Sequence, residues 1–542
     1  MMDRIGSRRS LALSSPNQLI PSGISPAFEI TDLEYTYEGS KQAALIDVQL
    51  KIQPGEFVII AGPSGSGKST LARSLAGFIP HEYNGTFHGS VEIYGQDTQT
   101  LPIRDIARKV SLIQQDPDSQ LVTLKVLNEV AFGPENFQVP PNDIRTQLEW
   151  ALNAIAANHL QSRSTHTLSG GEKQKVVISS FLTIRAPILI FDEPTARLDP
   201  PTTQEVVKTL NQLNQRGVTI LVVEHRIQPF LSIATRTVLL NEGRIHFDST
   251  PEQLHITPTT LTDMGVVLHP SVLSQPKPQI TSVASKTTLL DVYNLTYTYP
   301  RVEEFTPPLP ALKDVAFSVQ PGEIIAIMGA NGSGKSTLLL QLMGLLHPDT
   351  GFIQLNGENL LEQPVSRLAQ KVGMIFQNPL HQLFAQTVWE EVLLASEHLK
   401  IPEPNVARER AEALLDVLGL SNYRDQSPFS LSLGEQRRLT IASILLHHPQ
   451  LLLLDEPFIG QDYRNVHQIM RLQQQAAENG AAILLATHDG SIVERYCHRL
   501  LFLHAGQLLI DAPVQQGLDY MKTLGDSAYR LELNILEVER AG

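Results

Sequence analysis

The chain has 542 residues, and because a compact domain commonly holds about 150 residues, this length excludes a single compact core. Hydrophobic residues make up 42% of the chain, a share typical of packed globular domains, so disorder as the main state is excluded too. The net charge of −14 opposes attraction to nucleic-acid phosphates, and we expect no nucleic-acid partner.

The first 27 residues are predicted to form a disordered tail. Their longest apolar run, Leu11–Leu13, is too short for the core of a signal peptide. Further along, no run approaches the roughly 18 uninterrupted apolar residues of a membrane span. The single Cys497 excludes a disulfide framework and a thiolate metal site, and we interpret it as an inert small side chain in a reducing cytosol. We therefore expect a chain that is soluble by itself.

The sequence repeats itself once. The segment GPSGSGKST at residues 62–70 matches GANGSGKST at 329–337, and three further motif pairs follow in the same order. These pairs are LSGGE and LSLGE, FDEP and LDEP, and VVEH and LATH. The glycine-rich segments are 267 residues apart and the later pairs 263, so the period is that of whole domains. We expect a first domain at 28–268, a linker at 269–287, a second domain at 288–515 and a C-terminal segment at 516–542.

Apolar, β-rich runs end just before the motifs of both halves. They read EFVIIAG, PILIFDE and VTILVVEH in the first half, and EIIAIMG, LLLLDE and AAILLATH in the second. Such runs, separated by helical segments, are typical of buried parallel strands. The predicted fold class is therefore α/β, with a mainly parallel sheet in each half.

A helical subdomain is predicted between the glycine-rich segment and the acidic motif of each half. There, apolar residues recur at helical spacing, at Ile144, Leu148, Leu152 and Ile155 and at Val406, Leu414, Val417 and Leu418. Two insertions distinguish the halves, PHEYNGTFHG at 80–89 and PRVEEFTPPLP at 300–310. Their glycine and proline content predicts loops.

Both glycine-rich segments fit the P-loop pattern G-x4-G-K-S, each after a buried strand and before a helical run. Glycines let backbone N–H groups turn toward phosphates at the positive end of the helix, the lysine reaches the β- and γ-phosphates, and the serine hydroxyl binds Mg²⁺. The predicted nucleotide ligands are Gly62, Gly65, Gly67, Lys68, Ser69 and Thr70, and Gly329, Gly332, Gly334, Lys335, Ser336 and Thr337.

An acidic pair and a histidine follow the next apolar strands of each half. Asp192 and Asp455 end strands, where a carboxylate can face Mg²⁺. The next residues, Glu193 and Glu456, are placed to orient or deprotonate a water for attack on the γ-phosphorus. The matching histidines, which can contact the γ-phosphate and that water, are His225 and His488. The alternatives are an acidic pair that caps a helix and a histidine packed in the core.

The motif Leu168–Glu172 precedes a helical run, so Ser169 is a natural N-cap. Its hydroxyl, the N–H groups of Gly170 and Gly171 and the helix dipole form a possible second anion site. A plain helix cap is the alternative.

The order of these motifs resembles that of the ATP-binding cassette (ABC) ATPases, over residues 28–268 and 288–515. The resemblance implies tandem P-loop NTPase domains that bind ATP and Mg²⁺ and hydrolyse ATP. It also implies metal-contacting Q-loop glutamines, D-loop aspartates and tyrosines that stack on adenine, which here are Gln115 and Gln377, Asp199 and Asp462, and Tyr37 and Tyr299. A tyrosine packed in the core is the alternative for the last pair.

In that family two cassettes face each other head to tail, so each ATP lies between one P-loop and the other cassette's signature. The resemblance implies one site with Lys68, Gln115, Asp192, Glu193, His225, Ser432, Gly434 and Asp462, and a second with Lys335, Gln377, Asp455, Glu456, His488, Ser169, Gly170, Gly171 and Asp199. Leu433 departs from the pattern, because the first half has Gly170 there. Its side chain either displaces the backbone N–H or points harmlessly away.

The segments QQDPDSQLVTLKVLNEVAFGPEN, QNPLHQLFAQTVWEEVLLA and GFIPHEYNG are similar to those of energy-coupling factor (ECF) importers with two fused cassettes. This resemblance implies uptake of a vitamin, vitamin precursor or metal ion. It also implies two partners, a membrane coupling subunit and a small substrate-binding membrane subunit, and a peripheral location on the cytoplasmic face of the cell membrane. The alternative is a soluble mechanochemical ABC ATPase acting on ribosomes or nucleic acid, which the acidic charge disfavours.

Overall fold

The computed structural model describes residues 25–40, 42–196, 198–251, 253, 288–300, 309–399 and 403–523. The expected linker, almost all of the expected N-terminal tail, and residues 524–542 of the expected C-terminal segment lie outside these residues. Within the described ranges, no helix has both the length and the apolar character required to cross a membrane.

Each half is built on a six-stranded, mainly parallel sheet. In the first half the strand order is β10-β9-β3-β8-β7-β6, and in the second it is β16-β17-β18-β13-β19-β20. The six apolar runs predicted as strands form the parallel centres of these sheets, which confirms the predicted fold class. Within these two six-stranded sheets, only the edge strands β10 and β20 run antiparallel to their neighbours among the described pairings. The strands are β3 (Phe57–Ala61), β6 (Val110–Ile113), β7 (Ile188–Asp192), β8 (Thr219–Val223), β9 (Arg236–Asn241), β10 (Arg244–Ser249), β13 (Ile324–Met328), β16 (Val372–Ile375), β17 (Leu451–Asp455), β18 (Ala482–Ala486), β19 (Arg499–His504) and β20 (Gln507–Pro513).

A second, antiparallel four-stranded sheet in each half was not predicted from the sequence. Its strand orders are β2-β1-β4-β5 and β12-β11-β14-β15. The prediction of a loop at residues 80–89 is wrong in part, because β4 begins at Gly85 and pairs along β1 from Tyr37. Backbone pairing with a neighbouring strand outweighs local glycine content there. The strands are β1 (Phe28–Tyr37), β2 (Leu45–Ile52), β4 (Gly85–Ile93), β5 (Gln96–Asp97), β11 (Leu290–Tyr299), β12 (Leu309–Val319), β14 (Thr350–Leu355) and β15 (Glu358–Asn359). Most of the second predicted loop, residues 301–308, lies outside the described residues.

Helices flank the six-stranded sheets. In the first half they are α1 (Lys68–Leu75), α2 (Phe78–His81), α3 (Ile103–Ala107), α7 (Pro200–Asn214) and α8 (Gln228–Leu231). In the second half they are α11 (Lys335–Leu342), α12 (Val365–Leu368), α16 (Tyr463–Glu478), α17 (Gly490–Tyr496) and α18 (Val514–Thr523). Leu518 and Met521 of α18 are buried in the core of the second half, so the boundary expected at residue 515 falls inside this helix.

The predicted helical subdomains are present in both halves. They consist of α4 (Val126–Asn136), α5 (Pro141–Ala154) and α6 (Gly170–Leu182), and of α13 (Val388–Leu399), α14 (Pro404–Val417) and α15 (Leu433–Leu446). On α5, Leu148 and Leu152 are buried as expected. On α14 the predicted face is partly wrong, because Val406 and Val417 are exposed. The buried face of α14 instead uses small alanines, which allow close helix packing, together with leucines, at Ala407, Ala411, Leu414 and Leu415.

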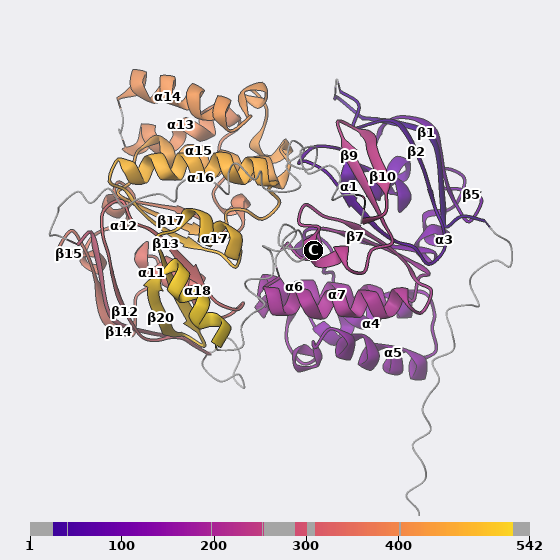
Figure 1. The fold of residues 1–542 in the computed structure, drawn as a ribbon, viewed down its shortest axis with the longest axis horizontal. Coiled ribbons are helices and arrows are strands. Elements are labelled where there is room, and N and C mark those ends of the chain that lie inside the picture. Colours follow the sequence, from indigo (N-terminus) through magenta and orange to yellow (C-terminus); the bar gives the residue numbers. More distant parts are fainter. Residues whose placement is uncertain are drawn as a thin grey trace, which may run out of the picture.

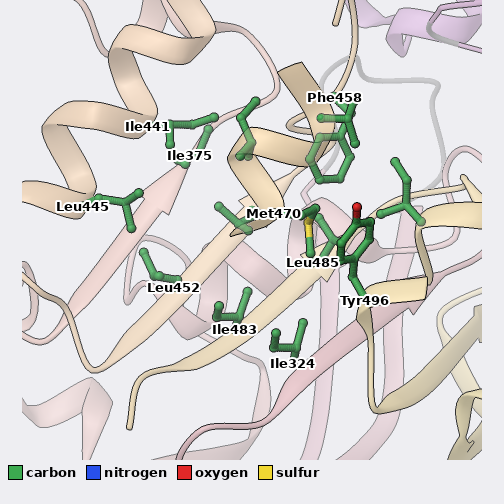
Figure 2. Close-up of a cluster of buried hydrophobic side chains, with 14 of the residues drawn as sticks. Ile324, Ile375, Ile441, Leu445, Leu452, Phe458, Met470, Ile483, Leu485 and Tyr496 are labelled. Atoms are coloured by element: carbon green, nitrogen blue, oxygen red, sulfur yellow. The ribbon is translucent and has the colours of Figure 1, made fainter. Parts of the chain in front are cut away.

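Each half has its own hydrophobic cores, one on either face of its six-stranded sheet. Alternate residues of β3 point to opposite cores, with Phe57 and Ile59 in one and Val58 and Ile60 in the other. Figure 2 shows one core of the second half, where side chains from the strands meet those of α15 and α16. The described core clusters do not mix residues of the two halves, so each half has cores of its own.

The two halves lie head to tail (Figure 1). The helical subdomain α4–α6 lies at the bottom of the first half in this view, whereas α13–α15 lies at the top of the second half. Hydrogen bonds between the halves confirm the contact and place both glycine loops on it.

Candidate active sites

The glycine loops turn from β3 into α1 and from β13 into α11. Gly67 has a φ of 98°, in the left-handed region, and a Cβ there would lie 2.4 Å from the carbonyl oxygen of Ala44, so only glycine fits. Within the loop, Lys68 Nζ donates hydrogen bonds to the carbonyl oxygens of Gly62 (2.9 Å) and Pro63 (2.7 Å). Lys335 makes the equivalent bonds in the second half. Burial lowers the pKa of Lys68, and the charges of Glu193 and Asp192 oppose that shift.

A carboxylate at the end of a central strand faces each glycine loop. Ser69 Oγ donates to Asp192 Oδ1 at 3.1 Å, and Ser336 likewise hydrogen-bonds to Asp455. Burial, together with the charge of Glu193, raises the pKa of Asp192 to about 6. Burial raises the pKa of Asp455 to about 6 as well, against the hydrogen bond from Ser336. Each site thus pairs a hydroxyl with a buried carboxylate that lacks full charge compensation, and these hard oxygen donors suit Mg²⁺.

The next residue, Glu193, is held in a strained conformation. Its φ is 50°, and Glu456 has 48°, in a region that residues other than glycine rarely adopt. In the first half, Glu193 accepts a hydrogen bond from Gln115 Nε2 at 2.5 Å and lies 3.0 Å from His225 Nε2. Burial alone would raise the pKa of Glu193, but His225 and then Lys68 hold it below its ordinary value. The carboxylate is therefore an anion that can accept a proton.

The second half holds its glutamate differently. Glu456 Oε1 lies 3.0 Å from His488 Nδ1, and burial is again outweighed, chiefly by His488, so that its pKa is lowered. Gln377, however, is exposed, whereas its counterpart Gln115 reaches the glutamate of its own half. The structure thus brings the predicted glutamine, glutamate and histidine together in the first half, and only the last two in the second.

The predicted adenine-stacking tyrosines lie beside the glycine-loop helices. The hydroxyl of Tyr37 is 3.2 Å from Thr70 Oγ1, and that of Tyr299 is 3.1 Å from Thr337 Oγ1. Both rings are half-buried and pack edge-on against a second tyrosine of the same strand. Part of each ring is accessible, although Tyr37 also packs against a hydrophobic core of the first half.

The D-loop aspartates join the two halves. Asp462 Oδ2 accepts a hydrogen bond from the backbone N–H of Ser64 in the opposite glycine loop at 2.8 Å. Asp199 Oδ2 accepts the reciprocal bond from the N–H of Asn331 at 2.9 Å. The other oxygen of each aspartate caps the helix that follows it. Asp199 Oδ1 accepts a hydrogen bond from the N–H of Thr202 in α7, and Asp462 Oδ1 accepts one from the N–H of Asn465 in α16. The two contacts are related by the sequence repeat, so the halves are paired about a pseudo-two-fold axis.

The signature serines cap their helices, as the sequence predicts for Ser169. Ser169 on α6 and Ser432 on α15 both form complete capping boxes with the glutamate three residues later. A Cβ on Gly434 would lie 2.9 Å from the carbonyl oxygen of Gly460, so glycine is needed there. Leu433 is half-buried and leaves the helix start unchanged, because the backbone angles of Ser432 (−61°, 158°) match those of Ser169 (−66°, 162°).

Four functional candidates were missed by the motif search. Gly460 lies over the opposite site, since a Cβ there would be 3.0 Å from Gln115 Nε2. Buried Arg437 donates to the carbonyl oxygens of Glu456, Ile459 and Gln377. The other two are Glu224, buried beside His225, and the ion pair of Arg226 with Asp489. Comparison of the two repeats position by position would have revealed all four, because each differs between the halves.

The glycine loops, strand-end acid pairs, poised glutamates and shared aspartates define the class of the protein. It is a P-loop nucleotide hydrolase with two cassettes on one chain, paired across their glycine loops. The sequence profile of the family described as "ABC transporter" matches residues 45–196 and 312–459. The chain belongs to this family, and it is an ATP-binding protein and an ATPase.

Relatives extend over nearly the whole chain. A protein of Methanosarcina mazei, provisionally named as an ABC transporter ATP-binding protein, is 33% identical over 537 residues, which cover 92% of this chain and 90% of the relative. A similarly named protein of Vibrio vulnificus is 35% identical over 522 residues, 90% of either chain. Among solved structures, that of cbiO1 from Clostridium perfringens is 28% identical, with 45% of this chain and 96% of that chain covered and a TM-score of 0.39. The similarity to the first two relatives thus extends over about nine tenths of each chain.

Proposed function

We propose that the chain is the ATP-hydrolysing subunit of an ECF-type importer. In this proposal, two ATP molecules bind between the halves and drive uptake of a vitamin, vitamin precursor or metal ion through separate membrane subunits. The proposal that each ATP site is shared between the halves rests on one observation. Each D-loop aspartate accepts a hydrogen bond from the glycine loop of the opposite half. We propose that the first cassette corresponds to residues 28–268, and that the second begins at residue 288 and extends beyond the expected residue 515 to the end of α18.

The chemistry of each site follows from its own residues. Lys68 and the backbone N–H groups of its loop bind the phosphates, and Glu193 orients a water and accepts its proton. His225 holds the carboxylate of Glu193 as an anion. Ser69 and Asp192 would hold Mg²⁺ in the first half, as Ser336 and Asp455 would in the second, and the cation would neutralise developing phosphate charge. Since the glycine loop of one half and the aspartate of the other share one site, closure of the halves precedes hydrolysis.

A membrane partner is supported by exposed apolar side chains beside both Q-loop glutamines. Val122 is seven residues after Gln115 and 68% exposed, and Phe384 is seven residues after Gln377 and 73% exposed. Two large apolar side chains exposed at equivalent positions favour a docking surface over isolated surface residues. We propose that the helices of the membrane coupling subunit dock here, which places the chain peripherally on the cytoplasmic face of the cell membrane.

The test is affinity purification of the full chain from native membranes, with identification of the proteins and small molecules that accompany it. We expect integral membrane subunits, one of them carrying the substrate, to be retained by the wild type. The double variant Val122→Glu with Phe384→Glu should lose them and keep its basal ATPase activity. Leu509→Glu is the matched control, because Leu509 is also exposed (46%) but lies on edge strand β20. Co-purification with ribosomes instead of membrane subunits would refute the proposal and favour the mechanochemical alternative.

A further inference from the structure

An ion pair joins two residues that occupy the same position in the two halves. Arg226 directly follows His225, and Asp489 directly follows His488, so the two are equivalent in the repeat. Arg226 Nη2 lies 2.9 Å from Asp489 Oδ2, across the contact between the halves. A residue that touches its own counterpart must lie close to the axis that relates the two copies. The reciprocal D-loop contacts define that axis, and this pair therefore lies on or near it.

The charges at this axis are specific to the pairing of unlike halves. If two first halves were paired in the same way, two arginines would meet at the axis. If two second halves were paired, two aspartates would meet there. Both arrangements bring like charges together in a partly dehydrated contact, which is unfavourable, whereas the observed arrangement brings opposite charges together.

Asp489 is built to present its charge to the opposite half. Its side chain is fully buried, and Oδ1 accepts hydrogen bonds from the N–H groups of Ser491 and Ile492 and from Ser491 Oγ. These bonds fix the carboxylate, so that Oδ2 faces Arg226. Burial opposes ionisation of Asp489, but Arg226 and the bonds from α17 hold its pKa below the ordinary value. A buried carboxylate of this kind depends on its cationic partner.

We propose that Arg226 and Asp489 form an axial ion pair that selects the pairing of the first half with the second and stabilises the closed arrangement. The pair also links the two sites, because each member directly follows the histidine that contacts the glutamate of its own half. Arg226 in addition adds to the influence of His488 in favouring the anionic form of Glu456. Separation of the halves leaves Asp489 without the arginine.

The proposal can be tested in the full chain. A single charge reversal at either position places two like charges at the axis, as the pairing of two identical halves would. Arg226→Asp places two carboxylates at the axis, and Asp489→Arg places two guanidinium groups there. Closure is reported by the distance between spin labels on cysteines introduced at Glu149 of α5 and Glu409 of α14, both of which are exposed. The native Cys497 is buried, and the unsubstituted chain serves as the control for its labelling. Closure is titrated with a non-hydrolysable ATP analogue and Mg²⁺. We expect each reversal to raise the half-maximal analogue concentration by about tenfold or more.

The decisive variant carries both reversals. Arg226→Asp with Asp489→Arg restores opposite charges and should return closure to within about threefold of the wild type. Asp489→Asn is the neutral control, because an asparagine still caps α17, and it should fall between the wild type and Asp489→Arg. Thermal unfolding of each variant separates lost closure from lost folding. Single reversals that close like the wild type, or a double reversal no better than the worse single one, would overturn the proposal.

Discussion

The two halves share a fold and a set of motifs, yet the glutamates that we propose as catalytic, Glu193 and Glu456, are held by different contacts. In the first half Glu193 is bonded through side chains, by Gln115 and His225, and a further acid, Glu224, is buried nearby. In the second half Thr487 replaces Glu224, and a buried arginine on the signature helix bonds three carbonyl oxygens around the glutamate. Duplication thus kept the reacting groups and changed their support, so the sites are expected to respond differently when that support is altered.

Removal of both catalytic glutamates is expected to have the largest effect. Glu193→Gln combined with Glu456→Gln should still bind ATP but hydrolyse it at least about a hundredfold more slowly, the scale of losing a positioned base. Nucleotide binding and turnover are measured on the same sample. Near-normal turnover would show that neither glutamate has the assigned role.

Substitution of the supporting arginine should affect only the second half. Arg437→Gln introduces the residue that the first half has at this position, Gln174, and leaves buried carbonyl oxygens unsatisfied. We expect a loss of about 3 kcal/mol in the free energy of unfolding of that half. Chemical denaturation measures the loss. Gln174→Leu is the control, since neither amide atom of Gln174 has a hydrogen-bond partner among the described residues, and it should cost little. Equal losses would mean that the halves are supported alike.

The extra acid of the first half should make stability depend on pH. Burial, with the charge of Glu193 adding to it, raises the pKa of Glu224 to about 7, well above that of an unfolded glutamate. The folded state therefore binds a proton at Glu224 more tightly than the unfolded state does. The stability that this difference provides is lost as pH rises from 5 to 7. Over that range the wild type should lose about 2 kcal/mol of unfolding free energy relative to Glu224→Gln. A difference between the two proteins that stays constant with pH would contradict this assignment.

The tyrosines at the rim of the glycine loops should contribute modestly to ATP binding. Tyr37→Ala is expected to weaken ATP binding at the first site by about 1 kcal/mol, whereas Tyr37→Phe keeps the ring and should bind almost normally. Equilibrium binding of a fluorescent ATP analogue measures the affinity of both variants. Tyr299→Ala and Tyr299→Phe provide the matched comparison at the second site. If Tyr37→Ala lowers the melting temperature without changing affinity, the ring is a packing residue.

The smallest effect concerns the signature that departs from the pattern. Because Leu433 leaves the helix start unchanged, the single variants Glu193→Gln and Glu456→Gln should lose similar shares of ATPase activity, within about threefold of each other. Steady-state turnover of the two variants decides this. Loss of most activity in Glu456→Gln alone would show that Leu433 impairs the site containing Lys68.

The sequence predicts the parts of the fold that depend on local pattern. The central strands and the cap at Ser169 could be predicted because burial on both faces produces unbroken apolar runs and capping requires one residue type. The antiparallel sheets could not, since their strands alternate and depend on partners far along the chain. The face of α14 was misjudged because alanines carry little hydrophobic signal although they pack closely.

The same distinction applies to the sites. The P-loop, acid pair and histidine were found because each is a short motif at the end of a strand. The positive φ of Glu193, the bonds of Arg437 and the axial pair of Arg226 and Asp489 arise from contacts between distant segments, which no motif contains. The sequence contains one signal for these residues, which is a difference between the two repeats. Where the neighbouring motif residues match and one residue differs, that residue is expected to contact a different partner in each half.

Each D-loop aspartate divides its two carboxylate oxygens between the two halves. One oxygen of Asp199 fixes the first turn of α7 and the other fixes the N–H of Asn331 in the opposite loop. Asp462 divides its oxygens in the same way between α16 and the N–H of Ser64. At each site one carboxylate thus joins the first turn of a helix in one half to the glycine loop of the other, so separation of the halves removes one of the two bonds that hold it.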